Sequence, residues 1–480
     1  MQISPSMIYN FVKVCEASED INLIDLVILQ NDKVLAQFCK KPYRKDGKRL
    51  LFSMTKSFTS LAVGIAIDKK LINLNDTMAS FFQEELPKCP HPNLLKMQIR
   101  HLLTMTTGLH DNTYADLFPQ KNWVKAFLAQ NFPHEPGTYY RYSTHATHML
   151  SAIIQKISGM SLEDFLNSHL FLRMGIKEVQ WERSPEGLIA GGMGLSLNIP
   201  SLIKIVHLLI NKGLYKKDRI ISEDYITLAT STQAIKQDDK NNPNQYFFGH
   251  HYGFQFHISQ DNTYRADGAF GQFCVIRPDR KVAIIATSQK TKTERFLEII
   301  HKYLINAVSH TDDISQKQLS DYLSGLSFPC PAANGAINKV PQCAFSIEAN
   351  ELNIKTIRFY EKKLSLIFSD GIQDEIAIDF TQIVYGKSHF IKDLQVHLQE
   401  HGVFAGWENV NILRITIYYI ETPYVGEYRF QFVEGKVIFT FSINVNMTLK
   451  GFTVVGKEYK DHSDHKKTRD SVLNKASQKC

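Results

Sequence analysis

A serine and a lysine three residues apart, Ser53 and Lys56, open an apolar run that extends to Asp68. In a helix, residues at this spacing lie on the same face. A serine hydroxyl becomes a useful nucleophile only when a base lies within hydrogen-bond reach. A lysine that is desolvated against an apolar helix can serve, because burial favours its neutral form. The pair therefore predicts a serine nucleophile with a lysine base, although the same four residues also fit a helix-capping serine followed by a solvated lysine.

Two further segments carry groups suited to such a site. Residues 136–144, PGTYYRYST, form a turn rich in hydroxyl groups that leads into a predicted helix and contains Tyr142 and Thr144. Residues 264–273, YRADGAFGQF, are glycine-rich at the edge of a predicted strand, where backbone N–H groups can approach a ligand closely. No Gly-Lys-Ser/Thr follows these glycines, so the segment is not a phosphate-binding loop.

Together the three segments resemble the serine β-lactamase and penicillin-recognising family. The most similar branch is the one with family VIII carboxylesterases and 6-aminohexanoate-dimer hydrolases. Residues 100–109, RHLLTMTTGL, and 191–196, GGMGLS, resemble two more of its conserved segments. The resemblance covers roughly residues 20–305, in the order that the family shows.

The resemblance implies a role for each motif. Ser53 matches the nucleophile, Lys56 the lysine of the same motif, and Tyr142 a tyrosine thought to act as general base or proton relay. Residues 266–268 occupy the place of the family's Lys-Thr-Gly motif. The backbone N–H groups of Ser53 and Ala269, next to Gly268, are then expected to form the oxyanion hole. The expected reaction is acylation of the serine followed by hydrolysis of the acyl-enzyme.

Two departures from the family pattern narrow the expected substrate. Thr144 stands where the family usually has an asparagine, and a hydroxyl cannot offer both an amide donor and an amide acceptor. Ala266 stands where penicillin-binding members have a lysine or histidine that helps to hold the substrate carboxylate. Both changes weaken the case for β-lactams and D-alanyl peptides, and they favour carboxylic esters or small amides.

Three interpretations remain open at this stage. The first is an active hydrolase of esters or small amides, with a small molecule as its substrate. The second is a relative without catalytic activity that keeps the fold as a binding or scaffold module, suggested by Thr144 and Ala266. The third is a β-lactamase or a peptidase that acts on D-amino-acid peptides.

The order of strands and helices expected around these residues predicts an α+β fold of the β-lactamase type. Two strands are expected within residues 21–38, and the helix with Ser53 and Lys56 at its start is expected to be buried. A helical insert follows, and later strands complete one antiparallel sheet with helices in layers against it. The expected helices of the insert are 97–105, 123–129, 147–158, 162–172 and 200–212. The expected later elements are strands 252–257, 273–276 and 282–286 and a helix at 293–308.

A polar stretch and a Pro- and Gly-containing stretch between residues 310 and 330 predict a domain boundary. The sequence thus predicts a hydrolase domain over residues 1–310 and a β-rich, sandwich- or barrel-like domain over residues 330–455. A basic tail over residues 456–480 is expected to be disordered. The expected strands of the second domain are 352–359, 364–368, 375–380, 412–421, 427–432, 437–444 and 447–454.

Composition limits partners and location. The net charge is +7, but the basic tail lacks the interleaved aromatic residues of a nucleic-acid site. Seven scattered cysteines form neither a zinc pattern nor a disulfide framework, and no cofactor or metal is expected. The first twenty residues lack a signal-peptide core, and no run is long enough for a membrane span. A cytoplasmic protein is therefore expected, with its oligomeric state left open.

Overall fold

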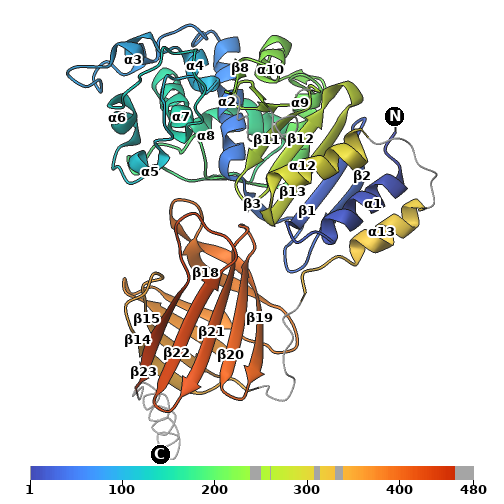
Figure 1. The fold of residues 1–480 in the computed structure, drawn as a ribbon, viewed down its shortest axis with the longest axis vertical. Helices are drawn as coiled ribbons and strands as arrows, with labels where there is room; N and C mark the ends of the chain where they lie inside the picture. Colours follow the sequence, from blue (N-terminus) through green and yellow to red (C-terminus); the bar gives the residue numbers. More distant parts are fainter. Residues whose placement is uncertain (1, 238–249, 260, 307–313, 330–338, 460–480) are drawn as a thin grey trace, which may run out of the picture. The chain divides into compact units, whose positions relative to one another are not determined.

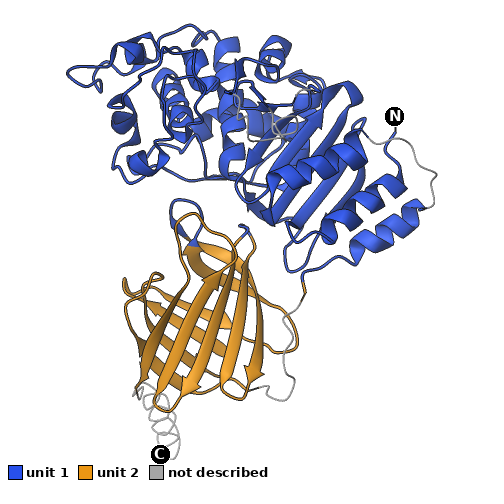
Figure 2. Cartoon of the chain, viewed as in Figure 1, with its two compact units in different colours: residues 1–328, 391–396, 421–423 blue, residues 329–390, 397–420, 424–480 orange. Residues whose placement is uncertain are grey.

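The computed structural model describes residues 2–237, 250–259, 261–306, 314–329 and 339–459. The chain forms two compact units (Figure 2). Unit 1 comprises residues 1–328 together with two short segments from later in the chain, residues 391–396 and 421–423. Unit 2 comprises the remaining residues, 329–390, 397–420 and 424–480. The predicted disordered tail lies almost wholly outside the described residues.

Unit 1 is built on an eight-stranded antiparallel sheet (Figure 1). Its first two strands pair with each other, and the first of them also pairs with the last strand of the sheet in sequence, so the long helical insert lies between two parts of one sheet. In spatial order the strands are β2 (Lys33–Cys39), β1 (Ile21–Gln30), β13 (Val282–Thr291), β12 (Gln272–Arg277), β11 (Tyr264–Gly268), β10 (His257–Ile258), β9 (His251–Tyr252) and β8 (Ala234–Ile235).

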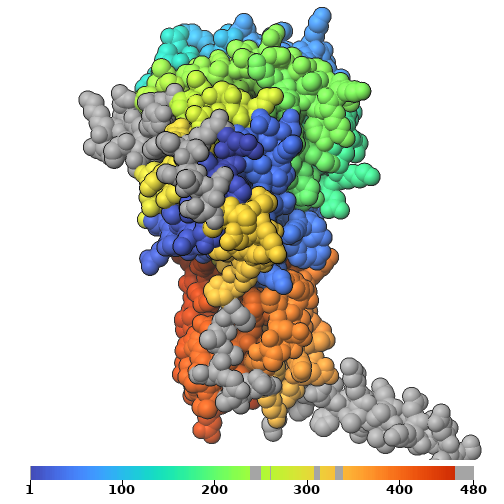
Figure 3. All heavy atoms as spheres, turned by 90° about the vertical axis from the view of Figure 1, so that its right-hand side faces the viewer, coloured from blue at the N-terminus to red at the C-terminus, as the bar shows by residue number. Residues whose placement is uncertain are grey.

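Both faces of this sheet are covered, because apolar side chains alternate along its central strands. In β1, Leu26 and Ile28 pack into one cluster, and Val27 and Leu29 pack into the other. The first cluster is closed by α1 (Pro5–Glu16), α12 (Thr293–Ile300) and α13 (Gln316–Ser324). Helices α1 and α13 lie side by side on the surface of unit 1 (Figure 3), where the rings of Tyr9 and Tyr322 are 4.7 Å apart.

The helical insert covers the opposite face of the sheet. Its central pair is α2 (Thr55–Asp68), which is buried over nearly its whole length, and α7 (Thr144–Ser158). The other helices of this layer are α3 (Pro92–Lys96), α4 (Ile99–Leu103), α5 (Tyr114–Leu117), α6 (Trp123–Leu128), α8 (Leu162–Leu166), α9 (Ile199–Ile210) and α10 (Glu223–Ala229). A small sheet of β3 (Lys48–Leu50), β5 (Leu195–Asn198) and β4 (Gln180–Trp181) stands beside them.

Unit 2 is a single, strongly curved ten-stranded sheet (Figure 1). Its two edge strands, β17 and β18, are joined by side chains: His389 Nδ1 lies 2.7 Å from Asp374 Oδ1, and its backbone N–H donates to the other oxygen. In spatial order the strands are β17 (Gln373–Ala377), β16 (Lys363–Phe368), β15 (Ile354–Tyr360), β14 (Cys343–Ile347), β23 (Phe452–Glu458), β22 (Lys436–Ile443), β21 (Val425–Val433), β20 (Ile412–Tyr419), β19 (Val396–Asn409) and β18 (Val384–Ile391).

The predicted fold class is confirmed: an antiparallel sheet flanked by helices, followed by a β-rich part. Several local expectations were wrong. The stretch expected to mark a boundary, residues 310–330, does contain the end of the main segment of unit 1 at residue 328, but it also contains an unpredicted helix, α13, because Leu319 and Leu323 give one apolar face that packs on unit 1. The strand expected over 252–257 is two short strands, β9 and β10, around a turn at Gln255 with a φ of 66°. Helix α1 and strands β14, β18 and β19 were not predicted.

In the described part of the chain, no helix combines the length and the apolar character needed to cross a membrane.

Candidate functional site: a serine, a lysine and a tyrosine

Ser53 lies in a tight turn immediately before α2. The turn, Phe52–Met54, is a short 3-10 helix that runs directly into α2 at Thr55. Lys56, on the first turn of α2, donates from Nζ to Ser53 Oγ at 3.0 Å and to the Gly192 carbonyl oxygen at 2.7 Å. The two side chains singled out by their spacing are therefore in direct contact, and a backbone carbonyl fixes the lysine.

Lys56 is only 2% exposed, which determines its protonation. Burial lowers the pKa of its ammonium to about 7, against the opposing effects of Asp393 and Asp267, whose negative charges favour the protonated form. A substantial fraction of Lys56 is then neutral near pH 7. A neutral amine 3.0 Å from a serine hydroxyl can accept its proton.

Tyr142 reaches the same place from the segment that precedes α7. Ser143 caps this helix by accepting from the Ala146 backbone N–H at 3.2 Å. The ring centre of Tyr142 lies 4.9 Å from Lys56 Nζ, and Ser53 is its hydrogen-bonding neighbour. Burial raises the pKa of Tyr142 far above its usual value, so the phenol is protonated at neutral pH. It is thus suited to pass a proton on, whereas Lys56 is suited to take the first one.

Strand β11 lies directly against the serine turn at Gly268. A side chain is not tolerated there, because an added Cβ would be 2.1 Å from the Leu51 carbonyl oxygen. On each side of this contact a phenylalanine has a left-handed backbone, Phe52 with a φ of 48° and Phe270 with a φ of 64°, and their rings pack edge to face at 5.3 Å. Such strained residues persist only where the surrounding structure holds them. The close approach places the serine turn beside the end of β11, which Ala269 directly follows.

Gly268→Ala is expected to destabilise the protein by about 1–3 kcal/mol, because the new methyl group forces the strand away from the serine turn. The melting temperature is the measurement. Gly325→Ala is the matched control, since its added Cβ would meet its nearest neighbour, the Tyr322 carbonyl oxygen, at 3.5 Å. A Gly268→Ala protein that melts with the wild type would contradict the described packing of β11 on this turn.

The two positions that depart from the family pattern differ in their surroundings. Ala266, which is 7% exposed, packs in the core cluster beneath the insert and offers no polar group. Thr144 packs against Gly192, where an added Cβ would lie 2.7 Å from the threonine methyl carbon. In the described structure the hydrogen bonds of Lys56 Nζ go to Ser53 and Gly192 and not to Thr144.

A charged cluster beside Tyr142 was not predicted. Asp267 lies 2.8 Å from Arg265 Nε and 3.2 Å from His257 Nε2, and Lys236 Nζ is 2.9 Å from His257 Nδ1. Burial acts to raise the pKa of Asp267, but its ion pair and hydrogen bonds with His257 and Arg265 hold the pKa well below its usual range. The His257 ring also stacks on Tyr142, with 6.3 Å between ring centres, so this carboxylate, ionised at neutral pH, lies beside the site.

Asp267 could have been considered from the sequence, since it stands inside the Ala266–Gly268 motif. His257 and Lys236 carried no comparable signal. His257 lies on β10 and Lys236 directly follows β8, and only the successive pairing of β8, β9, β10 and β11 brings them beside the motif.

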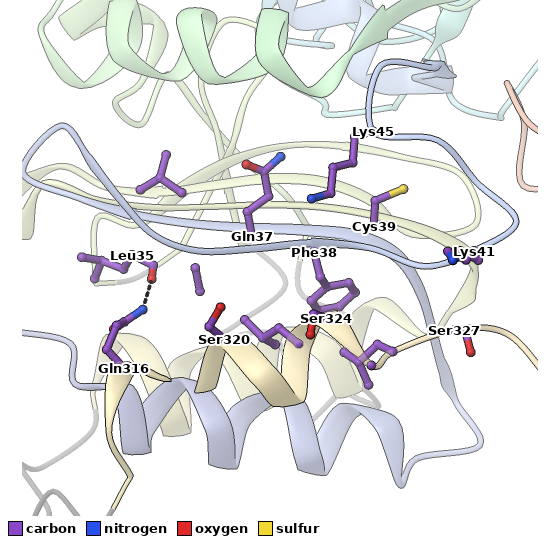
Figure 4. Close-up of a pocket in the computed structure, with 15 residues that line it drawn as sticks. Leu35, Gln37, Phe38, Cys39, Lys41, Lys45, Gln316, Ser320, Ser324 and Ser327 are labelled. Carbon is purple, nitrogen blue, oxygen red and sulfur yellow. Dashed lines mark hydrogen bonds between the residues drawn. The ribbon is translucent and has the colours of Figure 1, made fainter. Parts of the chain in front are cut away.

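A pocket of about 610 Å³ lies elsewhere in unit 1, between β2 and α13 (Figure 4). Gln316 Nε2 donates to the Leu35 carbonyl oxygen across it at 3.5 Å. None of its lining residues belongs to the Ser53, Lys56 and Tyr142 cluster, so it is not part of this site. Across the described residues, no group of three or more His, Cys, Asp or Glu side chains is placed to hold a metal ion.

One family model and several known proteins match parts of this chain. A family model described as Beta-lactamase matches residues 24–309. Penicillin-binding protein 4* from Bacillus subtilis (strain 168) is 30% identical over 154 residues, which are 29% of this chain and 32% of that protein. Protein flp from Staphylococcus aureus (strain MW2) is 25% identical over 138 residues, 28% of each chain. These matches thus span about a third or less of the curated relatives' own length.

Solved structures share the fold. The hydrolase EstCE1, described as having promiscuous acyltransferase activity, has a TM-score of 0.51 at 16% identity, covering 63% of this chain and 99% of that chain. A candidate 6-aminohexanoate-dimer hydrolase from Bacillus anthracis has a TM-score of 0.50 at 17% identity, covering 59% of this chain and 78% of that chain. At these identities the likeness concerns the fold.

Proposed function

Because the chain belongs to the Beta-lactamase family, we propose that it is a serine hydrolase that cleaves carboxylic esters or small amides through an acyl-enzyme on Ser53. The observation that carries the proposal is the contact between a buried, readily deprotonated lysine and the Ser53 hydroxyl, at 3.0 Å. An exposed serine–lysine pair would keep its ammonium and could not act as a base.

The first half of the reaction forms the acyl-enzyme. Ser53 Oγ bonds to the carbonyl carbon while its proton moves to Lys56 Nζ, and the carbonyl π electrons move onto the oxygen. The backbone N–H groups of Ser53 and Ala269 would hold this oxyanion, and one such donor is worth roughly 3–4 kcal/mol. When the tetrahedral intermediate collapses, the proton passes through Tyr142 to the departing alcohol or amine.

The second half releases the acid. A water molecule gives a proton to Lys56, and its oxygen bonds to the acyl carbon. The second tetrahedral intermediate then expels Ser53 Oγ, which takes this proton back from Lys56 through Tyr142 as the acid leaves. In this scheme Lys56 and Tyr142 exchange one proton in each half-reaction, and the enzyme returns to its starting state.

Charge in the site supports esters and small amides over β-lactams. Ala266 offers no cation for a substrate carboxylate, and Asp267 next to it is ionised and 19% exposed at its side chain. Arg265 pairs with Asp267 at 2.8 Å and offsets part of its charge, so the preference comes mainly from the missing cation at position 266. A substrate without a carboxylate beside its reacting carbonyl therefore suits the site better.

The purified protein is expected to hydrolyse p-nitrophenyl butyrate with a kcat/KM at least about tenfold above that for nitrocefin, which corresponds to about 1.4 kcal/mol of preference. Initial rates over a substrate series measure both values. The reverse order would favour the β-lactamase interpretation. No turnover of either compound, together with no covalent adduct from a fluorophosphonate probe, would favour the scaffold interpretation.

A further inference from the structure

A short segment far from the catalytic motifs in sequence contributes an acidic side chain to the Ser53 site. The segment, residues 391–396, belongs to unit 1, whereas the strands that flank it, β18 and β19, are mostly in unit 2. Its central residue, Asp393, is 9% exposed and stands 337 residues after Lys56 in the sequence. Burying a carboxyl group is costly unless neighbouring groups compensate it.

The segment is fixed in unit 1 by specific contacts on both sides of Asp393. The Glu182 carboxylate accepts from the backbone N–H groups of Leu394 at 2.7 Å and Gln395 at 3.0 Å. The Leu394 side chain packs on a small cluster that contains Trp123. These contacts fix the backbone of the segment next to Asp393, and they therefore fix the position from which the Asp393 side chain extends.

On the N-terminal side of Asp393, the segment is linked to β3, the strand that precedes the serine turn. Lys392 pairs with Glu421 and donates to Gln180 Oε1 at 2.9 Å. The Glu421 carbonyl oxygen accepts from the Leu50 backbone N–H at 2.8 Å. Leu50 is three residues before Ser53, so the position of Lys392 and the position of the nucleophile are linked through two contacts.

Asp393 and Lys56 are held by the same glycine-rich stretch. Lys56 Nζ donates to the Gly192 carbonyl oxygen at 2.7 Å, and the backbone N–H of Gly194 donates to the Asp393 carboxyl. Asp393 Oδ2 is buried and has no hydrogen-bond partner among the described residues. Asp393 Oδ2 can therefore carry negative charge that interacts electrostatically with Lys56.

We propose that Asp393 is a positioning residue for Lys56: its carboxylate stabilises the ammonium that forms when Lys56 Nζ takes the proton of Ser53. The inference rests on the proposed function, in which the Ser53 Oγ–H bond breaks, the proton binds Lys56 Nζ, and Oγ bonds to the substrate carbonyl carbon. A negative charge beside a buried amine favours the protonated amine. Asp393 would thus lower the cost of the proton transfer without touching the substrate.

The charges around the pair are consistent with this role. Burial raises the pKa of Asp393 to about 7 and lowers the pKa of Lys56 to about 7, so near neutral pH the two groups titrate together. Five other titratable groups interact electrostatically with Asp393 or with Lys56. They are Asp267 on β11, Glu182 after β4, Lys392 beside Asp393, Tyr114 on α5, and His145 on α7.

The test measures the titration of Lys56 directly, by NMR of protein labelled with ¹³Cε-lysine, with the Lys56→Met protein identifying the resonance. Asp393→Asn is expected to lower the titration midpoint of Lys56 by about one pH unit, since it removes a neighbouring negative charge. Asp116→Asn is the matched control, because Asp116 is an exposed carboxylate on α5. The pH profile of kcat/KM for the ester is recorded for the same proteins, and Asp393→Ser replaces Asp393→Asn if the latter does not fold.

The outcomes separate this inference from the function on which it rests. A lower Lys56 midpoint in Asp393→Asn, with the acidic limb of kcat/KM moved in the same direction, supports both. The same NMR shift without any Ser53-dependent hydrolysis supports the Asp393–Lys56 interaction and contradicts the hydrolase. An unchanged Lys56 midpoint in Asp393→Asn overturns the inference. This holds even when the ester rate of the variant falls by the same factor at every pH, which is the result expected for a purely structural residue.

Discussion

Ser53→Ala is expected to lower kcat/KM for p-nitrophenyl butyrate by about 10⁴-fold or more, because the acyl-enzyme cannot form without the hydroxyl. The loss should be nearly complete, since the oxyanion donors alone cannot replace a nucleophile. The expected change in stability is small: the substitution removes only a hydroxyl whose described partners are Lys56 and Tyr142, and Tyr142 stays packed against the core cluster through its ring. Steady-state kinetics and a melting curve measure both effects.

Ser57→Ala is the matched control one turn further along α2. Its hydroxyl is also buried, but it donates to the Gln255 carbonyl oxygen at 2.6 Å. This hydrogen bond gives it a structural role and not a catalytic one. It should keep most of the activity while losing some stability. Intact-mass analysis after treatment with a fluorophosphonate should show one adduct in the wild type and in Ser57→Ala. Wild-type turnover by Ser53→Ala, or an adduct that survives this substitution, would exclude Ser53 as the nucleophile.

A contact in the site can be predicted from the sequence when its two residues are close together in the chain. The contact of Ser53 with Lys56 is local, so helical spacing is enough to suggest it. Tyr142 is distant in the sequence, and only the resemblance to a family singled it out. The structure brings these three side chains together, while their catalytic roles stay predictions.

Other parts of the site depend on tertiary structure that no local pattern contains. Asp393 lies in a segment whose sequence, IKDLQV, has no special feature, and its place in unit 1 follows from contacts with Glu182 and Gly194. The same holds for α13, where two buried leucines and the partly buried Tyr322 in a polar stretch provide the apolar face. Secondary structure follows from local patterning, whereas the choice of which buried charges meet is made by the packing of distant segments.

Lys56→Met is expected to lower kcat/KM for the ester by about 10²–10⁴-fold, the range typical for loss of a positioned general base. The wild-type profile should rise with pH through about 7, because Lys56 accepts the proton of Ser53 only in its neutral form. This rise should be absent in Lys56→Met. Lys69→Met, at the exposed end of α2, is the control for loss of a lysine and should follow the wild type. A wild-type pH profile in Lys56→Met would assign the titration to another group.

The same substitution is expected to stabilise the fold at pH 6. Because burial lowers the pKa of Lys56 from 10.5 to about 7, the unfolded chain binds a proton that the folded chain lacks between these pH values. Lys56 therefore weakens the folded state most below pH 7, and the penalty disappears as the pH rises toward 10.5. A pKa change of this size corresponds to on the order of 5 kcal/mol.

That penalty exceeds the about 1–3 kcal/mol expected from leaving the Gly192 carbonyl oxygen without its donor. The melting temperature of Lys56→Met should thus exceed that of the wild type by several degrees at pH 6, and the difference should shrink or reverse at pH 9. Equal differences at both pH values would mean that Lys56 keeps its ordinary pKa in the folded chain. Lys56 could then not act as the base, and the proton of Ser53 would have to pass to Tyr142, whose own pKa is raised by burial. The stability measurement therefore tests the mechanism without a substrate.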